Sequence, residues 1–257
     1  MILALDIGNT HIVMGCLEDN EIRKVARMAT DPLRTEHEYA VMIKQILEID
    51  SIDNRGFDGA IISSVVPPLT STLKKAIERV TGRKPMVLGA GLKTGLNIML
   101  DNPAQLGSDL VAAGVAAQAD YKLPVIIIDM GTATTITVIN ENSAFLGGAI
   151  IPGTALSMNA LASGTSQLPK VSIEAPKHCI GTNTIDCMKS GAVFGAASML
   201  DGMIERIEAE LGCEASVVAT GGLARSITPY CKRKIVCDDD LLLRGLGIIY
   251  NKNARKR

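Results

Sequence analysis

The sequence predicts an α/β protein made of two duplicated lobes, each built on a mixed β-sheet. Three observations predict this class. An aliphatic strand that ends in Asp-x-Gly occurs twice, at residues 2–10 and 125–135. The same order of further strands and helices follows each copy. Of the 257 residues, 47% are apolar and 21% are charged, which is typical of a folded globular chain.

The elements of the two halves correspond in order. Each Asp-x-Gly strand pairs with a second strand in a hairpin, and a third strand, a helix and a fourth strand follow. The first half has strands at 2–7, 12–14, 22–28 and 59–64 and a helix at 36–49. The second has strands at 125–130, 136–139, 144–151 and 215–220 and a helix at 153–163.

Two further helices, around 108–119 and 183–211, are expected to pack on the sheets and between the halves. A strand meander followed by alternating helix and strand predicts a mixed sheet rather than uniform β-α-β alternation. The boundary is expected near 120–124, which gives lobes 1–120 and 121–257 with a central cleft.

Composition excludes several classes of partner. The net charge is -1 and aromatic residues make up only 3%, so nucleic acid is not expected as a ligand. The basic tail of Lys252 and Arg255–Arg257 is interpreted as a solvated C-terminus. No apolar run approaches the roughly 18 residues of a membrane span, and Asp6 comes too early for a signal peptide. Six cysteines without a C-x-x-C pair indicate reduced thiols. We therefore expect a soluble, cytoplasmic protein with no membrane partner.

Each Asp-x-Gly segment has residue types suited to a triphosphate. Asp6 and Asp129 each end a strand, where a rigidly held carboxylate can orient magnesium or potassium beside phosphate oxygens. Gly8 and Gly131 let the backbone approach phosphate without a Cβ in the way. Amide and hydroxyl donors follow in both copies: Asn9, Thr10, Thr132, Thr134 and Thr135. One copy alone is also explained as a hairpin turn, but two copies in duplicated halves favour phosphate binding.

A glycine-rich turn supports the same interpretation. Thr220, Gly221 and Gly222 lie where an aliphatic strand meets a helix, so a nucleoside could lie against the backbone there while the helix N-terminus faces an anion. An ordinary strand-to-helix turn explains this segment equally well when it is taken alone. Neither a P-loop nor a G-x-G-x-x-G motif follows any strand.

Phosphoryl transfer also requires a group that accepts the proton of the acceptor alcohol. Asp109 is the best candidate, because it opens a long Ala-rich helix after a loop punctuated by Pro103 and Gly107. A carboxylate in the first turn is also explained by the helix dipole. The other candidates are weaker. His11 could lie on the outer face of the second strand, and no possible partner stands at a suitable spacing from His37 or His178. Asp238–Asp240 is explained more simply as a solvated helix N-cap.

These motifs together resemble type III pantothenate kinase over almost the whole chain. The resemblance rests on Asp6-Ile-Gly-Asn-Thr, Gly107-Ser-Asp109, Asp129-Met-Gly-Thr and Thr220-Gly-Gly, in that order. Pro152-Gly153, Ile180-Gly-Thr-Asn-Thr184 and Arg244-Gly-Leu246 also match. It implies the duplicated ribonuclease-H-like fold of actin and the sugar kinases, and transfer of the γ-phosphate of ATP to pantothenate, the first step of coenzyme A synthesis.

The resemblance also implies roles for particular residues. Residues from Asp6 to Val13, together with Thr132, would bind ATP, and Asp129 would bind a monovalent cation, potassium or ammonium. Asp109 would accept the proton. The acceptor would lie near Gly107, Ser108, Leu110 and Thr184. The working unit would be a homodimer.

Two positions depart from the family pattern. The family loop commonly reads Tyr-x-Asn-Pro and then Gly-Ala-Asp-Arg, whereas this chain has Leu100 and Leu110 in place of the Tyr and the Arg. The resemblance places both of those polar residues against pantothenate. Losing a charge-assisted partner of an acidic substrate costs about 1.5–3 kcal/mol. The two leucines therefore favour, as an alternative, a kinase with a less acidic alcohol acceptor. A non-catalytic regulator that binds a nucleotide is a further alternative, against which the presence of Asp6, Asp109 and Asp129 argues.

Overall fold

The computed structural model describes residues 1–19 and 21–254, and the chain forms two compact units. The first contains residues 1–96, 101–119 and 240–254, and the second contains 97–100 and 120–239. The expected second lobe ran to residue 257, whereas helix α8 (Leu241–Ala254) packs with the first unit. Asn20, within the first predicted turn, and the basic tail from Arg255 lie outside the described residues.

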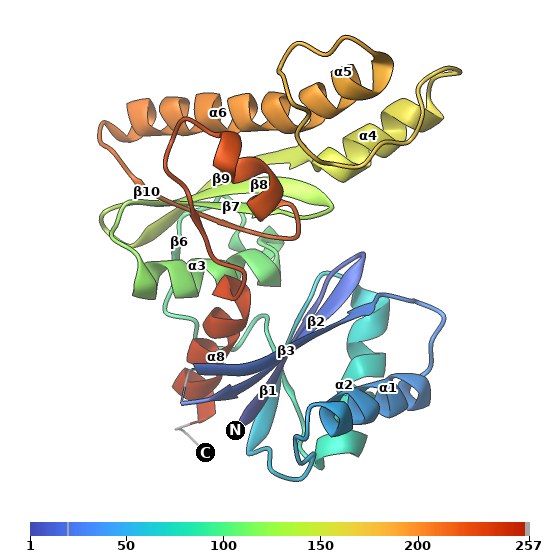
Figure 1. Cartoon of the computed structure of the whole chain (residues 1–257). Helices are drawn as coiled ribbons and strands as arrows, with labels where there is room; N and C mark the ends of the chain where they lie inside the picture. The colour runs from blue at the N-terminus through green and yellow to red at the C-terminus, as the bar shows by residue number, and fades with distance from the viewer. Residues whose placement is uncertain (20, 255–257) are drawn as a thin grey trace. The chain divides into compact units, whose positions relative to one another are not determined.

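The sheet of the first unit has five strands in the order β3-β2-β1-β4-β5. They are β1 (Ile2–Ile7), β2 (His11–Glu18), β3 (Glu21–Ala29), β4 (Gly59–Ser64) and β5 (Met86–Val87). Strands β1, β2 and β3 of this sheet are labelled in Figure 1. The first three form an antiparallel meander, whereas β4 runs parallel to β1 and β5 runs parallel to β4. β1 and β4 are buried almost throughout, which explains their continuous apolar sequence.

Helices cover both faces of this sheet. Alternate residues of β1 point to opposite faces, and Leu3 and Leu5 join the core formed with α1 (Glu36–Ile49) and α2 (Pro67–Thr81). On the other face, Gly59 lies against Tyr250 of α8, where a side chain at position 59 would overlap the tyrosine ring. The first unit also contains η1 (Pro103–Gln105) and nearly all of α3 (Ser108–Asp120).

The sheet of the second unit has six strands in the order β11-β10-β7-β8-β9-β6. They are β6 (Asn97–Ile98), β7 (Val125–Met130), β8 (Ala133–Ile139), β9 (Ala144–Pro152), β10 (Ser216–Thr220) and β11 (Val236–Cys237). The helical elements are α4 (Thr154–Ser163), α5 (Thr184–Ser190), η2 (Gly191–Gly195), α6 (Ala196–Leu211), α7 (Ala224–Ile227) and η3 (Thr228–Tyr230). The core lies between α6 and the buried side chains of β7, β8 and β10.

The two sheets confirm the predicted duplication. Reading β9-β8-β7-β10-β11 repeats the order and the strand directions of β3-β2-β1-β4-β5, and β6 is added beside β9. Asp6 pairs in register with Ser63 of the parallel strand β4, and Asp129 pairs with Thr220 of β10. Each Asp-x-Gly strand therefore occupies the same place in its own sheet.

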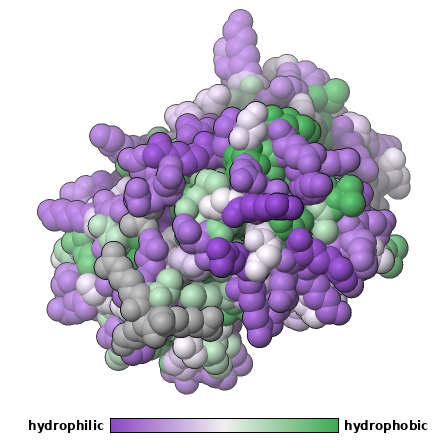
Figure 2. Space-filling model, turned by 90° about the horizontal axis from the view of Figure 1, so that it is seen from below, coloured by the Kyte–Doolittle hydropathy of each residue, from purple (hydrophilic) through white to green (hydrophobic). Residues whose placement is uncertain are grey.

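The predicted elements are confirmed with two local differences. The helix expected over 183–211 is interrupted, because η2, between Gly191 and Gly195, is a π-helical turn that separates α5 from α6. The helix expected after Gly222 is the single turn α7, four residues long. The face drawn in Figure 2 is mostly hydrophilic, with hydrophobic residues in small separate groups. Within the described residues, no helix combines the length and the apolar character that crossing a bilayer requires.

Candidate active site

The first Asp-x-Gly turn directly follows the half-buried Asp6 near the end of β1. The Gly8 amide donates a hydrogen bond to the His11 carbonyl at 3.0 Å, which closes the hairpin. A Cβ on Gly8 would lie 3.0 Å from the same oxygen, so glycine avoids a tight backbone contact in this turn. The Thr30 hydroxyl donates to the Gly8 carbonyl at 2.7 Å and anchors the turn to the residue that follows β3. The other predicted residues of this turn lie at its tip or on β2: Asn9, Thr10 and Val13.

The second Asp-x-Gly turn is closed in the same way. Asp129 lies near the end of β7, and the Gly131 amide donates to the Ala133 carbonyl at 3.1 Å. Gly153 packs on this turn: its amide donates to the Thr132 carbonyl at 3.1 Å, and a Cβ on it would overlap the Thr132 carbonyl. The Pro-Gly segment that contains Gly153 therefore holds the second turn in place.

The Thr-Gly-Gly segment contacts the second turn directly. Thr220 pairs with Asp129 in register, and Gly221 has the left-handed backbone angle φ +92°. A Cβ built on Gly221 would lie 2.6 Å from Asp129 Oδ1 and 2.7 Å from the Met130 backbone. The Leu223 amide reaches the Met130 carbonyl at 3.4 Å. The structure thus brings together two motifs that are about ninety residues apart in the sequence.

Two observations refine the predicted role of this segment. A helix N-terminus was expected to face an anion after Gly222. Because α7 is a single turn, the positive potential at its N-terminus is much smaller than that of a full helix. A separate polar atom is available beside Asp129. The hydroxyl of Thr135, its partner in β8, is buried and has no hydrogen-bond partner among residues 1–19 and 21–254. A buried hydroxyl of this kind is suited to a ligand or cation at the end of β7.

Asp109 lies in the first turn of α3, and its carboxylate turns back toward the preceding loop. Its Oδ1 accepts a hydrogen bond from the Leu110 amide at 2.9 Å. A Cβ on Gly107 would overlap this carboxylate, so the glycine provides the space that it occupies. Burial raises the pKa of Asp109 above its ordinary value, and the hydrogen bonds from the backbone amides of Leu110 and Asp109 oppose that rise.

Ser108 connects the start of α3 to the end of β4. Its hydroxyl lies 3.0 Å from the Ser63 hydroxyl, accepts from the Ser64 amide at 3.0 Å and lies 3.1 Å from the Ser64 carbonyl oxygen. No sequence motif pointed to Ser63 or Ser64 as site residues. The duplication contains a signal that could have found them, because Ser63 occupies the place in the first sheet that Thr220 occupies in the second.

Thr184 lies apart from the other predicted residues of the second unit, in a broad depression of about 770 Å³. Apolar side chains line much of it, and Thr182, Asn183 and Thr184 supply polar groups. Asn183 caps α5 by accepting the Asp186 amide at 2.9 Å, which fixes the exposed Thr184 at the first position of the helix. The volume is within the range of small-molecule sites.

Leu100 follows β6 and packs on the neighbouring strand. Its Cδ2 would lie 3.0 Å from a Cβ at Gly147, which has the left-handed angle φ +113° within β9. Leu110 is half-buried in the first turn of α3. Both positions therefore present aliphatic side chains where the family pattern has Tyr and Arg.

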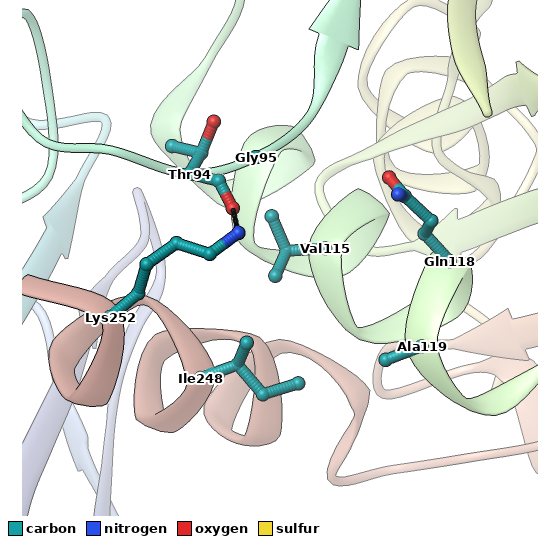
Figure 3. A pocket seen from close by; sticks show the side chains of 7 residues that line it. All are labelled: Thr94, Gly95, Val115, Gln118, Ala119, Ile248 and Lys252. Atoms are coloured by element: carbon teal, nitrogen blue, oxygen red, sulfur yellow. Dashed lines mark hydrogen bonds between the residues drawn. The ribbon is translucent and has the colours of Figure 1, made fainter.

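A second pocket, of about 130 Å³, lies in the first unit away from the first turn of α3 (Figure 3). It is lined by the second half of α3, by α8 and by Thr94 and Gly95, and Lys252 donates to the Thr94 carbonyl at 3.0 Å. Its volume is too small for a nucleotide.

The remaining candidates contribute no site. The side chain of His11 is exposed, and Asp239 pairs with Arg225 at 2.7 Å. Within the described part of the chain, no group of three or more His, Cys, Asp or Glu side chains is placed to hold a metal ion. A cation at Asp129 would therefore take further ligands from water or from a phosphate, as magnesium usually does.

Comparison with known proteins identifies the relatives of the chain. It is 42% identical over 254 residues to the type III pantothenate kinase of Halalkalibacterium halodurans, and the aligned region covers 99% of this chain and 100% of the relative. The fold is similar to (R)-2-hydroxyglutaryl-CoA dehydratase component A from Acidaminococcus fermentans, with TM-score 0.58, 16% identity and coverage of 100% and 99% of the two chains. It is also similar to inorganic polyphosphate/ATP-glucomannokinase from Arthrobacter, with TM-score 0.51, 14% identity and coverage of 100% and 99%.

These likenesses confirm the expected fold, a duplicated α/β structure of the actin-like and sugar-kinase type. The family described as type III pantothenate kinase matches residues 2–206, which is most of the chain. Its residues include both Asp-x-Gly turns, the start of α3 and Thr184. The chain therefore belongs to the type III pantothenate kinase family.

Proposed function

We propose that this protein transfers the γ-phosphoryl group of ATP to the primary alcohol of pantothenate, forming 4'-phosphopantothenate and ADP. The observation that carries the proposal is the half-buried Asp109 carboxylate at the start of α3, in the same unit as the Asp6 turn. The full-length relationship to a type III pantothenate kinase supports the choice of acceptor.

Asp109 is proposed as the general base. It accepts the proton of the acceptor hydroxyl while the alcohol oxygen bonds to the γ-phosphorus and ADP departs with the bridging oxygen. Burial raises the pKa of Asp109, which makes its carboxylate a better proton acceptor than an exposed aspartate. The glycine at position 107 keeps space free around that carboxylate.

The two Asp-x-Gly turns are proposed to bind ATP through Gly8, Asn9, Thr10, Val13, Gly131 and Thr132, together with Thr220, Gly221 and Gly222. Asp6 and Asp129 fit the cations that the family implies, magnesium and potassium or ammonium, because hard cations prefer carboxylate oxygens. The buried, unpartnered Thr135 hydroxyl beside Asp129 supports this assignment. When bound, these cations neutralise phosphate charge. The polar residues of the two turns orient the phosphates, and the glycines keep side chains away from them.

The acceptor is proposed to contact Gly107, Ser108 and Leu110 at the start of α3, and Leu100 and Thr184. The polar rim at Thr182–Thr184 supports a role for Thr184 in binding a hydroxyl or amide group. The side-chain hydroxyl of Ser108 is engaged with β4, so Ser108 would offer its backbone rather than its side chain.

A coupled assay of ADP release tests the proposal. Purified protein is assayed with ATP, magnesium and potassium, with and without pantothenate, and the product is identified by mass spectrometry. We expect ADP release that depends on pantothenate and a product one phosphate heavier than the acceptor. Absence of turnover at millimolar pantothenate would reject the proposal.

A second candidate function is phosphorylation of a less acidic alcohol, favoured by Leu100 and Leu110. A panel of alcohols, vitamins and nucleosides compares the acceptors. The double variant Leu100→Tyr with Leu110→Arg is expected to lower the pantothenate KM about ten- to a hundredfold if the charged contact is missing. A wild-type preference for pantothenate over every other alcohol would exclude this candidate.

The predicted homodimer and cytoplasmic location also remain proposals. Exposed apolar side chains on the second unit support a self-association surface: Ile150, Leu156, Leu161, Ile180 and Ile185. Sedimentation equilibrium of the wild-type chain and of Leu156→Glu checks this, because a dimer held by this surface would dissociate in the variant.

A further inference from the structure

We propose that Ser63 is a positioning residue for Asp109, and that it acts through its hydrogen bond to the Ser108 hydroxyl. This inference rests on the proposed function, in which Asp109 is the general base. The residues concerned all belong to the first unit. The contacts among Ser63, Ser64 and Ser108 are called the serine latch below.

The serine latch joins a strand end to a helix start. Ser108 is the first residue of α3, and Asp109 is the second. Ser63 and Ser64 are the last residues of β4, and they pair in register with Asp6 and Ile7 of β1. The latch therefore connects the strand end beside the first Asp-x-Gly turn to the residue that precedes the proposed base.

Each serine hydroxyl has only one proton to donate, and this assigns the donor in each hydrogen bond. The Ser108 oxygen accepts from the Ser64 amide at 3.0 Å, and its single proton can be donated once. If that proton goes to the Ser64 carbonyl at 3.1 Å, the contact of 3.0 Å with Ser63 requires the Ser63 hydroxyl as donor. All three contacts are then satisfied together, which leaves the Ser108 side chain a single rotamer.

The hydrogen bond between Ser63 and Ser108 is shielded from water. Ser63 is 0% exposed, so water cannot replace its partner without a local opening. Thr70 adds support from α2 by donating to the Ser64 hydroxyl at 2.9 Å. Because a serine at the first position of a helix is held by two residues of a central strand, the start of α3 cannot shift along β4 while the latch is intact.

The size of the effect follows from the number of bonds involved. Ser63 reaches Asp109 only through the Ser108 hydroxyl, so its removal leaves Asp109 in the first turn of α3 and we expect the latch to refine the placement of the carboxylate. One neutral hydrogen bond corresponds to an effect of about three- to tenfold.

Steady-state kinetics of Ser63→Ala, Ser108→Ala and the double variant test the inference, with pantothenate as acceptor. Each single variant is expected to lower kcat about three- to tenfold, with the ATP KM changed less than twofold. The double variant should be no slower than the slower single variant, because the two hydroxyls act through one bond. Additive losses, or an unchanged kcat in Ser63→Ala, would overturn the proposal.

A matched control separates positioning from general stability. Thr81→Val also removes a buried hydroxyl from the first unit, one that donates within α2 to the Ile77 carbonyl at 2.9 Å. It is expected to lower the free energy of unfolding without lowering kcat. If Thr81→Val reduced kcat as much as Ser63→Ala does, the latch would be merely structural.

Hydrogen–deuterium exchange gives a readout that does not need turnover. In Ser63→Ala, the amides of residues 108–111 are expected to exchange faster than in the wild type, with no change in α1. Equal exchange at 108–111 would overturn the latch even if pantothenate turnover were confirmed. Failure of the wild type to phosphorylate pantothenate would instead reject the proposed function, while exchange would still decide the latch.

Discussion

Gly221 lies directly against the carboxylate of Asp129, where a Cβ would come within 2.6 Å of Oδ1. The backbone of Gly221 is also in the left-handed region, at φ +92°. The close approach and the backbone angle both exclude a side chain. The end of β7 and the Thr-Gly-Gly segment therefore form one unit, and a change in either disturbs the other.

Replacing Gly221 with alanine should impair ATP binding more than stability. Alanine adds about 1–3 kcal/mol of backbone strain and displaces the Asp129 carboxylate or the turn itself. We expect the ATP dissociation constant, measured by calorimetry with potassium and magnesium, to rise at least about tenfold. Gly212→Ala is the matched control, because Gly212 also has a left-handed backbone angle, φ +71°, but a Cβ there meets no atom within 4 Å. Equal effects of the two changes would show that the contact with Asp129 is unimportant.

Asp109→Asn should remove most turnover while leaving ATP affinity nearly unchanged. Asparagine keeps the shape and one acceptor oxygen for the Leu110 amide, but it cannot take a proton from an alcohol. General base catalysis contributes about 10²–10⁴-fold, so kcat is expected to fall by that factor. ATP binding by calorimetry provides the control. Normal kcat in this variant would show that another group is the base.

The raised pKa of Asp109 predicts opposite effects of pH on activity and on stability. The base must be ionised, so the acid limb of kcat/KM should lie above the ordinary aspartate pKa of about 4. The folded chain holds this proton to higher pH than the unfolded chain, so the free energy of unfolding falls as pH rises through the interval between the two pKa values.

Asp109→Asn provides the measurement, because asparagine does not titrate. Urea unfolding at neutral pH should show the variant to be more stable than the wild type, and the difference should disappear below the ordinary aspartate pKa. A variant that is equally stable or less stable than the wild type at neutral pH would contradict the direction of the pKa shift.

Gly245→Ala should destabilise the first unit. A Cβ at position 245 would overlap the carbonyl of Ala112, so α8 and α3 must separate. Backbone cannot move aside as a flexible side chain does, and overpacking costs about 1–3 kcal/mol. Gly202→Ala in α6 is the matched control, because the nearest atom is the end of the Arg206 side chain at 3.1 Å. That change should be neutral or stabilising, since alanine favours helix. Thermal unfolding of both variants checks the contrast.

Local sequence patterns were sufficient to predict the elements and the duplication. The predicted helix at 36–49 and the predicted strand at 59–64 coincide with α1 and β4, because their periodic or continuous apolar patterns match one element type. The repeated Asp-x-Gly hairpin led to the repeated strand order in the same way. The short helix α7 and the π-helical turn η2 were not predicted, since packing rather than propensity ends a helix there.

Contacts between distant segments were decided by tertiary structure alone. The sequence by itself determined which residue types end β1, β7 and β10, and therefore the candidate phosphate-binding residues. It did not show that Gly221 meets Asp129, or that Ser63 bonds to Ser108, because strand pairing and helix packing bring these residues together across 92 and 45 positions. Those pairings depend on which faces are buried in the folded chain, and no local pattern encodes them.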